Sequence, residues 1–268
     1  MKDTSILTGK GIRTGAEYIA GLQDDREIWT QGKRVKDVTS EPGMSRGVSS
    51  LAGFLDNQHN DKYRDKVTYV DEDGIRCPLS FKTPKSKQDI LDRGKAYYEW
   101  ATWSHGMFGR TPDYKNASLM SFAAARSFLD QGTKGNAEFS KNMLDFYNYA
   151  RTNDQILTHT LINPSVSHKQ AAAGIYNDQV ALHVVKETDA GIIVTGARLL
   201  ATLGPFADEI EVFPSTVLKA DPANIPFAFA FHLPLLLRSC CCPPLVPVLP
   251  QMFDPRPLVL VPIWFYIF

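Results

Sequence analysis

Two predicted helices meet at the stretch Gly109-Arg110-Thr111-Pro112-Asp113-Tyr114. It brings a guanidinium, a carboxylate and a phenol within five residues. Pro112 fixes its own φ angle and disfavours the helical region for Thr111. The stretch is therefore predicted to be a rigid turn that presents Arg110 and Tyr114 into a cleft. A connection in which Arg110 and Asp113 only pair with each other explains the same residues.

Helical patterns lie on both sides of this turn. Residues 86–103 form a predicted helix that Ser86 and Asp89 begin as a capping box. Its apolar residues at helical spacing are Ile90, Leu91, Ala96, Tyr97 and Trp100. Two further helices are predicted over residues 117–129 and 137–150, separated by glycines.

The first 81 residues mix short helices and strands. A capping box at Thr14 and Glu17 predicts a helix over residues 14–22, and apolar spacing predicts another over 47–59. A β-hairpin with a turn at Gln31-Gly32-Lys33 is predicted for residues 25–38. Strands are also predicted at residues 67–70 and 79–81.

The pattern changes after Pro164, where short strands dominate. They are predicted at residues 180–185, 191–196, 197–202, 209–213 and 227–231. Strands at this spacing are typical of a sheet or barrel. The chain is thus predicted to be α+β, with an α-rich N-terminal domain over 1–155 and a β-rich middle domain over 156–231.

Composition narrows the class of function. The chain has 29 basic and 29 acidic residues, which argues against nucleic-acid binding as the main function. Three of its four cysteines are consecutive, Cys240 to Cys242, which is neither a disulfide framework nor the ligand spacing of a metal site. We therefore expect no metal. The N-terminus has no apolar core of a signal peptide, so a cytoplasmic location is expected, with no membrane partner.

Residues 232–268 differ in composition from the rest of the chain. They hold eight of the 17 prolines and three charged residues, Arg238, Asp254 and Arg256. Prolines interrupt every apolar run that could span a membrane, and no ligand spacing favours a functional tail. We interpret this Pro-rich apolar tail as the product of a reading-frame shift, and expect it to be disordered or sticky.

Several stretches, in order, resemble one known family. They are residues 25–29, 32–39, 109–114, 159–164, 186–198 and 213–216. The chain resembles, over about residues 14–231, the oxygenase component of the two-component, reduced-FAD-dependent 4-hydroxyphenylacetate 3-monooxygenases. Six ordered motifs are a specific signal, whereas any one of them is weak.

The resemblance implies an acyl-CoA-dehydrogenase-like fold: an α-rich N-terminal domain, a β-barrel middle domain and a C-terminal helical bundle that is absent here. It implies ortho-hydroxylation of 4-hydroxyphenylacetate to 3,4-dihydroxyphenylacetate with O2 and reduced FAD. A separate NAD(P)H-flavin reductase supplies the reduced flavin. The intact family forms homo-oligomers, which we do not expect for a truncated chain.

The resemblance also carries residue roles. It implies three catalytic residues around the phenol oxygen, Arg110, Tyr114 and His159, whose chemistry suits phenolate stabilisation and proton exchange. It implies substrate contacts by Arg110, Thr111, Pro112, Asp113, Tyr114, His159, Ser215 and Thr216. It implies flavin contacts by His159, Thr160, Leu161, Ile162, Asn163, Ser165, Val166, Ser167, His168 and Thr202.

Other interpretations stay open. The chain can be a catalytically inactive fragment of such an enzyme, or a hydroxylase of another phenol, because Ser215 and Thr216 do not specify an acetate side chain. His159 taken alone is more often a structural histidine. The related 4-hydroxybutyryl-CoA dehydratases need cysteine ligands near the central turn, and no cysteine lies between Cys77 and Cys240.

Overall fold

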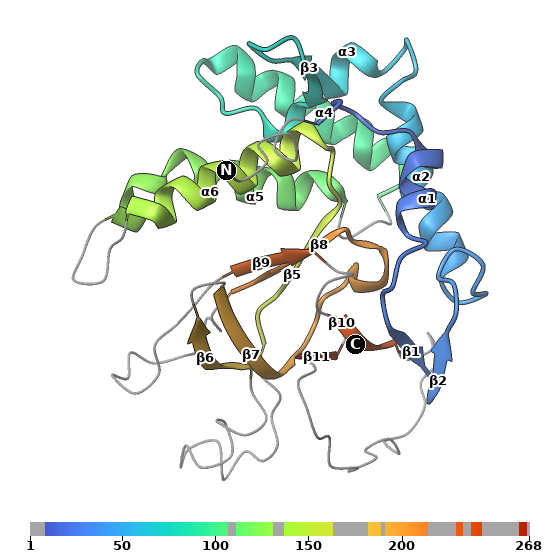
Figure 1. Ribbon diagram of the computed structural model, residues 1–268. Helices are drawn as coiled ribbons and strands as arrows, with labels where there is room; N and C mark the ends of the chain where they lie inside the picture. The colour runs from blue at the N-terminus through green and yellow to red at the C-terminus, as the bar shows by residue number, and fades with distance from the viewer. Residues whose placement is uncertain are drawn as a thin grey trace. The chain divides into compact units, whose positions relative to one another are not determined.

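The computed structural model describes residues 9–106, 111–130, 137–162, 182–188, 191–213, 229–232, 237–242 and 263–266. The chain divides into two compact units (Figure 1). The first holds residues up to Leu22 together with Arg46–Leu157, and the second holds Gln23–Ser45 together with Thr158–Phe268. Each unit is described by itself.

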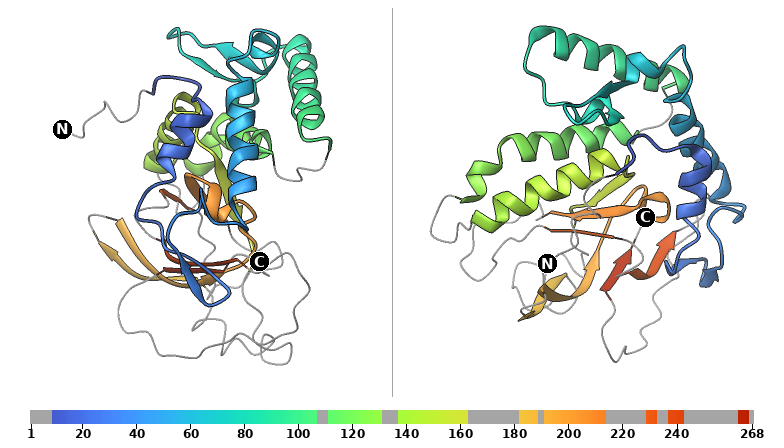
Figure 2. Two further views of the ribbon diagram at one scale, coloured as in Figure 1. Left: turned by 90° about the vertical axis from the view of Figure 1, so that its right-hand side faces the viewer. Right: turned by 45° about the horizontal axis from the view of Figure 1, so that its top comes forward.

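The first unit is mainly helical. Its helices are α1 (Gly15–Gly21), α2 (Ser45–Asn57), α3 (Arg64–Val67), α4 (Lys87–Trp103), α5 (Pro112–Ala124) and α6 (Ala137–Thr152). The 3-10 helices η2 (Leu79–Phe81) and η3 (Arg126–Asp130) and the antiparallel hairpin of β3 (Thr68–Val70) and β4 (Arg76–Pro78) complete its described part. Helices α5 and α6 lie side by side (Figure 2).

The predicted helix starts are confirmed by local hydrogen bonds. The Thr14 hydroxyl accepts from Glu17 N at 3.2 Å, and Thr14 N donates to the Glu17 carboxylate at 2.8 Å, so both arms of the capping box are present. The Ser86 hydroxyl likewise accepts from Asp89 N at 3.1 Å at the start of α4. A polar side chain that satisfies an otherwise unpaired N–H defines where each helix begins.

The predicted apolar face of residues 86–103 is only partly buried. Ala96 and Trp100 are 1% and 3% exposed, but Ile90 and Leu91 are 61% and 50% exposed. Trp100 belongs to an aromatic cluster in which its ring lies 5.2 Å from Phe54. The predicted helix is confirmed, but its apolar face stays exposed near its N-terminal end, because helical spacing does not tell how far along a helix its neighbours extend.

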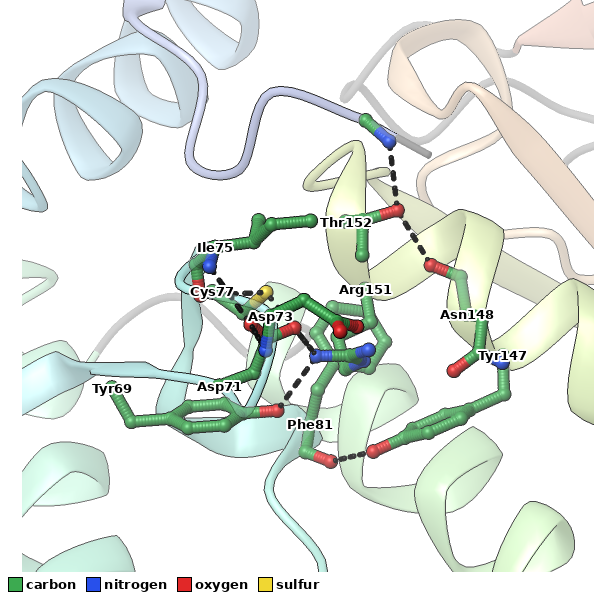
Figure 3. Close-up of polar contacts among 11 residues, drawn as sticks. Tyr69, Asp71, Asp73, Ile75, Cys77, Phe81, Tyr147, Asn148, Arg151 and Thr152 are labelled. Carbon is green, nitrogen blue, oxygen red and sulfur yellow. Dashed lines mark hydrogen bonds and ion pairs between the residues drawn. The ribbon is translucent and has the colours of Figure 1, made fainter. Parts of the chain in front are cut away.

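One polar cluster fastens the β3–β4 hairpin to the end of α6 (Figure 3). The Arg151 guanidinium donates to the Asp71 carboxylate and to the Tyr69 hydroxyl, and lies 3.6 Å from the Cys77 sulfur. Asp71 also accepts from Ile75 N at 2.8 Å, which shapes the hairpin turn. Burial raises the pKa of the Cys77 thiol to about 12, so this cysteine is an unreactive part of the core.

Two expected elements of the first unit differ from the structure. Residues 79–81 form η2 rather than a strand, and β4 lies just before them at residues 76–78. The predicted helix over residues 117–129 begins earlier, at Pro112, and ends at Ala124, after which η3 follows. Alternation of Leu79, Ser80 and Phe81 suggested a strand, yet all three are buried, so no solvent face exists to enforce the alternation.

The described residues of the second unit form two sheets. One has the strand order β2-β1-β10-β11-β7-β6. Its four central strands, β1 (Ile28–Thr30), β10 (Leu237–Cys242), β11 (Ile263–Tyr266) and β7 (Gly191–Arg198), are parallel to one another. The edge strands β2 (Lys33–Val35) and β6 (His183–Thr188) are antiparallel to β1 and β7. The other has the order β5-β8-β9, from β5 (Leu157–Thr160), β8 (Glu209–Val212) and β9 (Phe229–His232).

The hairpin predicted for residues 25–38 is confirmed as β1 and β2. Its turn is Gln31-Gly32, both with positive φ angles of 50° and 73°, and Lys33 already belongs to β2. Two consecutive positive φ angles match the twist of the flanking strands. Of the later strands, those at 180–185, 191–196, 209–213 and 227–231 have described counterparts in β6, β7, β8 and β9. Residues 197–202 form no separate strand, because β7 continues to Arg198.

Arg26 explains why residues 23–45 belong to the second unit. Its guanidinium is 6% exposed and donates to the Pro205 and Ala207 carbonyls at 2.9 and 3.1 Å. Pro205 belongs to the 3-10 helix η5 (Gly204–Phe206), and Ala207 follows it directly. Two further bonds of 2.7 Å to the Asp24 carboxylate balance the charge. A buried, fully paired guanidinium thus joins segments 179 residues apart.

Part of the Pro-rich tail is ordered in strands. Residues 240–242 pair with 28–30 of β1, and Phe265 of β11 lies opposite Arg198 of β7. The expectation of a tail without regular structure is therefore wrong for β10 and β11. Backbone pairing does not depend on an alternating side-chain pattern, which is why composition did not predict it. The reading-frame interpretation stays a prediction.

Candidate functional site

The end of β5 and the turn after β7 are joined by hydrogen bonds. The Thr160 hydroxyl donates to the Leu199 carbonyl at 2.6 Å, and Leu199 N donates to the Ile162 carbonyl at 2.8 Å. At the other end of the turn, Leu203 N donates to the Thr158 hydroxyl at 3.4 Å. Predicted flavin-contact residues on the two segments, His159 to Ile162 and Thr202, are therefore brought close together although about 40 residues separate them.

The turn contains a strained residue at its exposed tip. Leu200 has a φ angle of 68°, which non-glycine residues rarely adopt, and its side chain is 43% exposed. Ile162 and Thr202 are exposed as well. A turn held at both ends thus presents apolar and hydroxyl groups to the surroundings, as a ligand-binding edge requires.

The predicted flavin residues differ in what they offer. Thr160 is fully buried, its hydroxyl donates to the Leu199 carbonyl and its own carbonyl accepts from Phe213 N, so its polar groups hold the protein together. His159 and Leu161 are half-buried. Outside the described residues lie Asn163, Ser165, Val166, Ser167 and His168, as do the predicted substrate residues Arg110, Ser215 and Thr216.

The central turn predicted from the sequence is the start of α5. Thr111 is the N-cap with an extended backbone, and Pro112 occupies the first helical turn, so Asp113 and Tyr114 lie in the helix rather than in a turn. Proline favours this position because its missing N–H would have no partner there. Tyr114 is 47% exposed, whereas Asp113 is 8% exposed.

Asp113 sits in a buried polar corner of the first unit. In the part of the chain that the structure describes, one of its carboxylate oxygens has no hydrogen-bond partner, and neither has the side-chain oxygen of Asn116, three residues on. The Asn116 amide donates to the Ser80 hydroxyl at 3.0 Å. Burial raises the pKa of the Asp113 carboxyl above its ordinary value, against smaller opposing hydrogen bonds. The site therefore favours a neutral carboxyl.

We expect Asp113→Asn to raise the Tm by about 2–4 °C at pH 8 and to leave it unchanged near pH 4. An acid whose pKa is raised by folding stabilises the fold while it is protonated, and this contribution is lost as the pH rises through the native pKa. The measurement is thermal unfolding followed by circular dichroism at several pH values. The control is Asp92→Asn on α4, where a Lys95 hydrogen bond lowers the pKa, so that the Tm should fall or stay unchanged at pH 8. A lower Tm for Asp113→Asn at pH 8 would contradict the buried-acid interpretation.

One buried charged residue of this region had no predicted role. Arg198 ends β7, and its guanidinium is 3% exposed. Its Nη1 donates to the Leu161 carbonyl at 3.5 Å, while its Nε has no hydrogen-bond partner among the described residues. The sequence showed Arg198 only as the last residue of the family-like stretch 186–198. An arginine after an apolar strand normally marks the exposed end of that strand, so its burial was not predicted.

Comparison with known proteins identifies the family. The family described as 4-hydroxyphenylacetate 3-hydroxylase N terminal matches residues 14–237. The oxygenase component of 4-hydroxyphenylacetate 3-monooxygenase from Thermus thermophilus is 41% identical over 223 residues, which cover 83% of this chain and 44% of that protein. The oxygenase component of 4-nitrophenol 2-monooxygenase from a Rhodococcus species is 34% identical, over 70% of this chain and 35% of that protein.

A solved structure agrees with this match. The oxygenase component of 4-hydroxyphenylacetate 3-monooxygenase complexed with FAD and 4-hydroxyphenylacetate superposes with a TM-score of 0.75 at 40% identity, over 83% of this chain and 45% of that one. The fold is thus that of the acyl-CoA-dehydrogenase-like oxygenase components. The chain belongs to the 4-hydroxyphenylacetate 3-hydroxylase family, as its motifs predicted, and it spans less than half the length of the relatives it matches.

Two features are absent from the described part of the chain. None of its helices is long and apolar enough to cross a membrane. It also contains no group of three or more histidine, cysteine, aspartate or glutamate side chains that could hold a metal ion.

Proposed function

We propose that this chain is the N-terminal part of a reduced-FAD-dependent aromatic hydroxylase that acts on 4-hydroxyphenylacetate. The observation that carries the proposal is the hydrogen-bonded junction of residues 159–162 with the turn at Thr202, in a chain of this family. The same proposal includes a β-barrel middle domain and a cytoplasmic location. It also includes substrate contacts by Arg110, Thr111, Pro112, Asp113, Tyr114, Ser215 and Thr216.

The residues suit a flavin nucleotide. A flavin nucleotide carries negative charge, and Arg198 offers a buried guanidinium. Its Nη1 donates to the Leu161 carbonyl, and its Nε has no hydrogen-bond partner among the described residues. Exposed Ile162 and Leu200 offer apolar surface near hydroxyl-bearing Thr202. A nucleotide cofactor site usually combines a cation, an apolar surface and backbone polar groups. Bound reduced flavin would supply the activation of O2.

The chain's own residues would prepare the phenol. Arg110 stays charged and would stabilise a phenolate, which makes the ring more electron-rich. His159 would hold or move the phenol proton, since an imidazole exchanges protons near neutral pH. Tyr114 would orient the phenol oxygen by a hydrogen bond. A separate NAD(P)H-flavin reductase would be the partner that delivers reduced flavin.

Two alternatives stay within this proposal. The first is that the substrate is another phenol, because one relative is named for 4-nitrophenol. The matched region covers 44% of the Thermus relative, so groups contributed by the rest of that relative have no counterpart among these 268 residues. An inactive fragment is therefore the second interpretation of the polypeptide as it stands.

The test is product formation by the 268-residue polypeptide. With 4-hydroxyphenylacetate, O2, NADH and a flavin reductase, we expect no 3,4-dihydroxyphenylacetate. These residues match 44% of the Thermus relative, and a pocket built from them alone is expected to bind FAD about three decades more weakly. The full-length Thermus oxygenase component is the positive control. Catechol above the reductase-only level, with matching NADH use, would show instead that this polypeptide is active by itself.

A further inference from the structure

Two buried arginines in the second unit have opposite surroundings. Arg26 is 6% exposed and makes charge-assisted bonds to Asp24 together with bonds to two carbonyls. Arg198 is 3% exposed and has a single hydrogen bond, of 3.5 Å, to a neutral carbonyl. Within the described residues, Arg198 forms no ion pair. Arg26 thus has both a carboxylate and carbonyl acceptors, whereas Arg198 has one carbonyl acceptor and no charged partner among the described residues.

An incomplete buried guanidinium is costly to the fold. Burial lowers the pKa of Arg198, yet arginine keeps its charge, so the cost cannot be removed by loss of a proton. Its backbone is in the interior of a sheet, opposite Phe265, and could carry an apolar side chain. Residues that cost stability are commonly retained at binding sites, where a ligand supplies the missing partner.

The surroundings of Arg198 indicate which ligand. Leu161, whose carbonyl accepts from Arg198, lies within the segment predicted to line the flavin, and Thr202 follows Arg198 by four residues. The hydrogen bonds of Thr160 and Leu199 hold the segments on both sides of it. A cation fixed between two segments that we assign to a flavin nucleotide would meet an anionic group of that nucleotide.

We propose that Arg198 is an anion-binding residue that pairs with an anionic group of the flavin nucleotide. This inference rests on the proposed function. Two groups share the required chemistry: the phosphates, which are charged in every redox state, and the reduced ring, which is anionic only after reduction. Arg198→Met preserves the length of the side chain and removes the charge.

The experiment compares wild type, Arg198→Met and Arg26→Met by Tm and by titration with FAD, riboflavin, reduced FAD and pyrophosphate. For Arg198→Met we expect an unchanged or higher Tm without ligand and a FAD affinity lower by about tenfold or more. Arg26→Met, which breaks a complete set of bonds, should lower the Tm. If phosphate is the partner, riboflavin binding is unchanged and stabilisation by pyrophosphate is lost. If the reduced ring is the partner, only reduced FAD loses affinity.

Three outcomes would decide against parts of this scheme. A lower Tm of unliganded Arg198→Met, with equal losses for FAD and riboflavin, would make Arg198 a structural residue. Unchanged binding of every ligand by the variant would also overturn the inference. If pyrophosphate stabilises only the wild type while no flavin binds it even at millimolar concentration, the anion site stands and the flavin function fails.

Discussion

Replacing Arg151 by methionine is expected to lower the free energy of unfolding by about 3–5 kcal/mol. The side chains of Arg151 and Asp71 are only 11% and 7% exposed, so removal of the guanidinium leaves a buried carboxylate without its main partner. The same substitution removes the bond to Tyr69 that helps to join β3 to α6 (Figure 3). Chemical denaturation followed by tryptophan fluorescence measures the effect.

A matched arginine in the same unit is the control. Arg64 forms an ion pair with Asp61 at 2.8 Å, but the two side chains are 37% and 91% exposed. Exposed pairs contribute about 0–1 kcal/mol, so Arg64→Met should change stability little. Equal losses for the two variants would show that burial does not decide the strength of the Arg151 pair.

The effect of Arg151→Met should depend on pH. Burial by itself raises the pKa of Asp71, but hydrogen bonds from Arg151 and from the Ile75 backbone outweigh it, so the pKa lies below its ordinary value. A lowered carboxyl pKa stabilises the fold above the unfolded-state pKa, and the contribution is lost as the pH falls through the native pKa. The difference between wild type and variant should therefore narrow below about pH 4.

Replacing His159 by alanine is expected to reduce hydroxylation about 100-fold while flavin oxidation continues and releases hydrogen peroxide. The proposed role of His159 is to hold or move the phenol proton, whereas the activation of O2 belongs to the flavin. The measurement is catechol formed per NADH consumed. It is made in a chimaera in which residues 14–237 replace the matched part of the Thermus relative.

The control for His159→Ala is His59→Ala. His59 is exposed and follows α2, and no role in the site is assigned to it. This variant should keep the coupling of the unsubstituted chimaera. If His159→Ala kept that coupling too, proton handling by His159 would be ruled out, and the histidine would be a structural residue of β5.

Local signals determined much of the fold before any tertiary information. The capping box at Thr14, the N-cap at Ser86 and a hairpin turn around Gly32 were predicted correctly, because each depends on atoms within a few residues of chain. The ordered motifs also indicated the family, which the comparisons confirm. Pro112 was assigned to a turn, yet proline is equally suited to the first turn of a helix, which is where it lies.

Only tertiary structure decided which side chains are buried and what they meet. Arg151 and Arg198 are both arginines near the end of an element, but one finds Asp71 from a hairpin 80 residues earlier and the other finds a single carbonyl. The parallel pairing of β10 with β1, and the joining of residues 23–45 to the second unit through Arg26, likewise depend on segments far apart in the chain. Local sequence specifies a helix cap or a turn, whereas burial and charge pairing depend on distant segments that meet only in the folded chain.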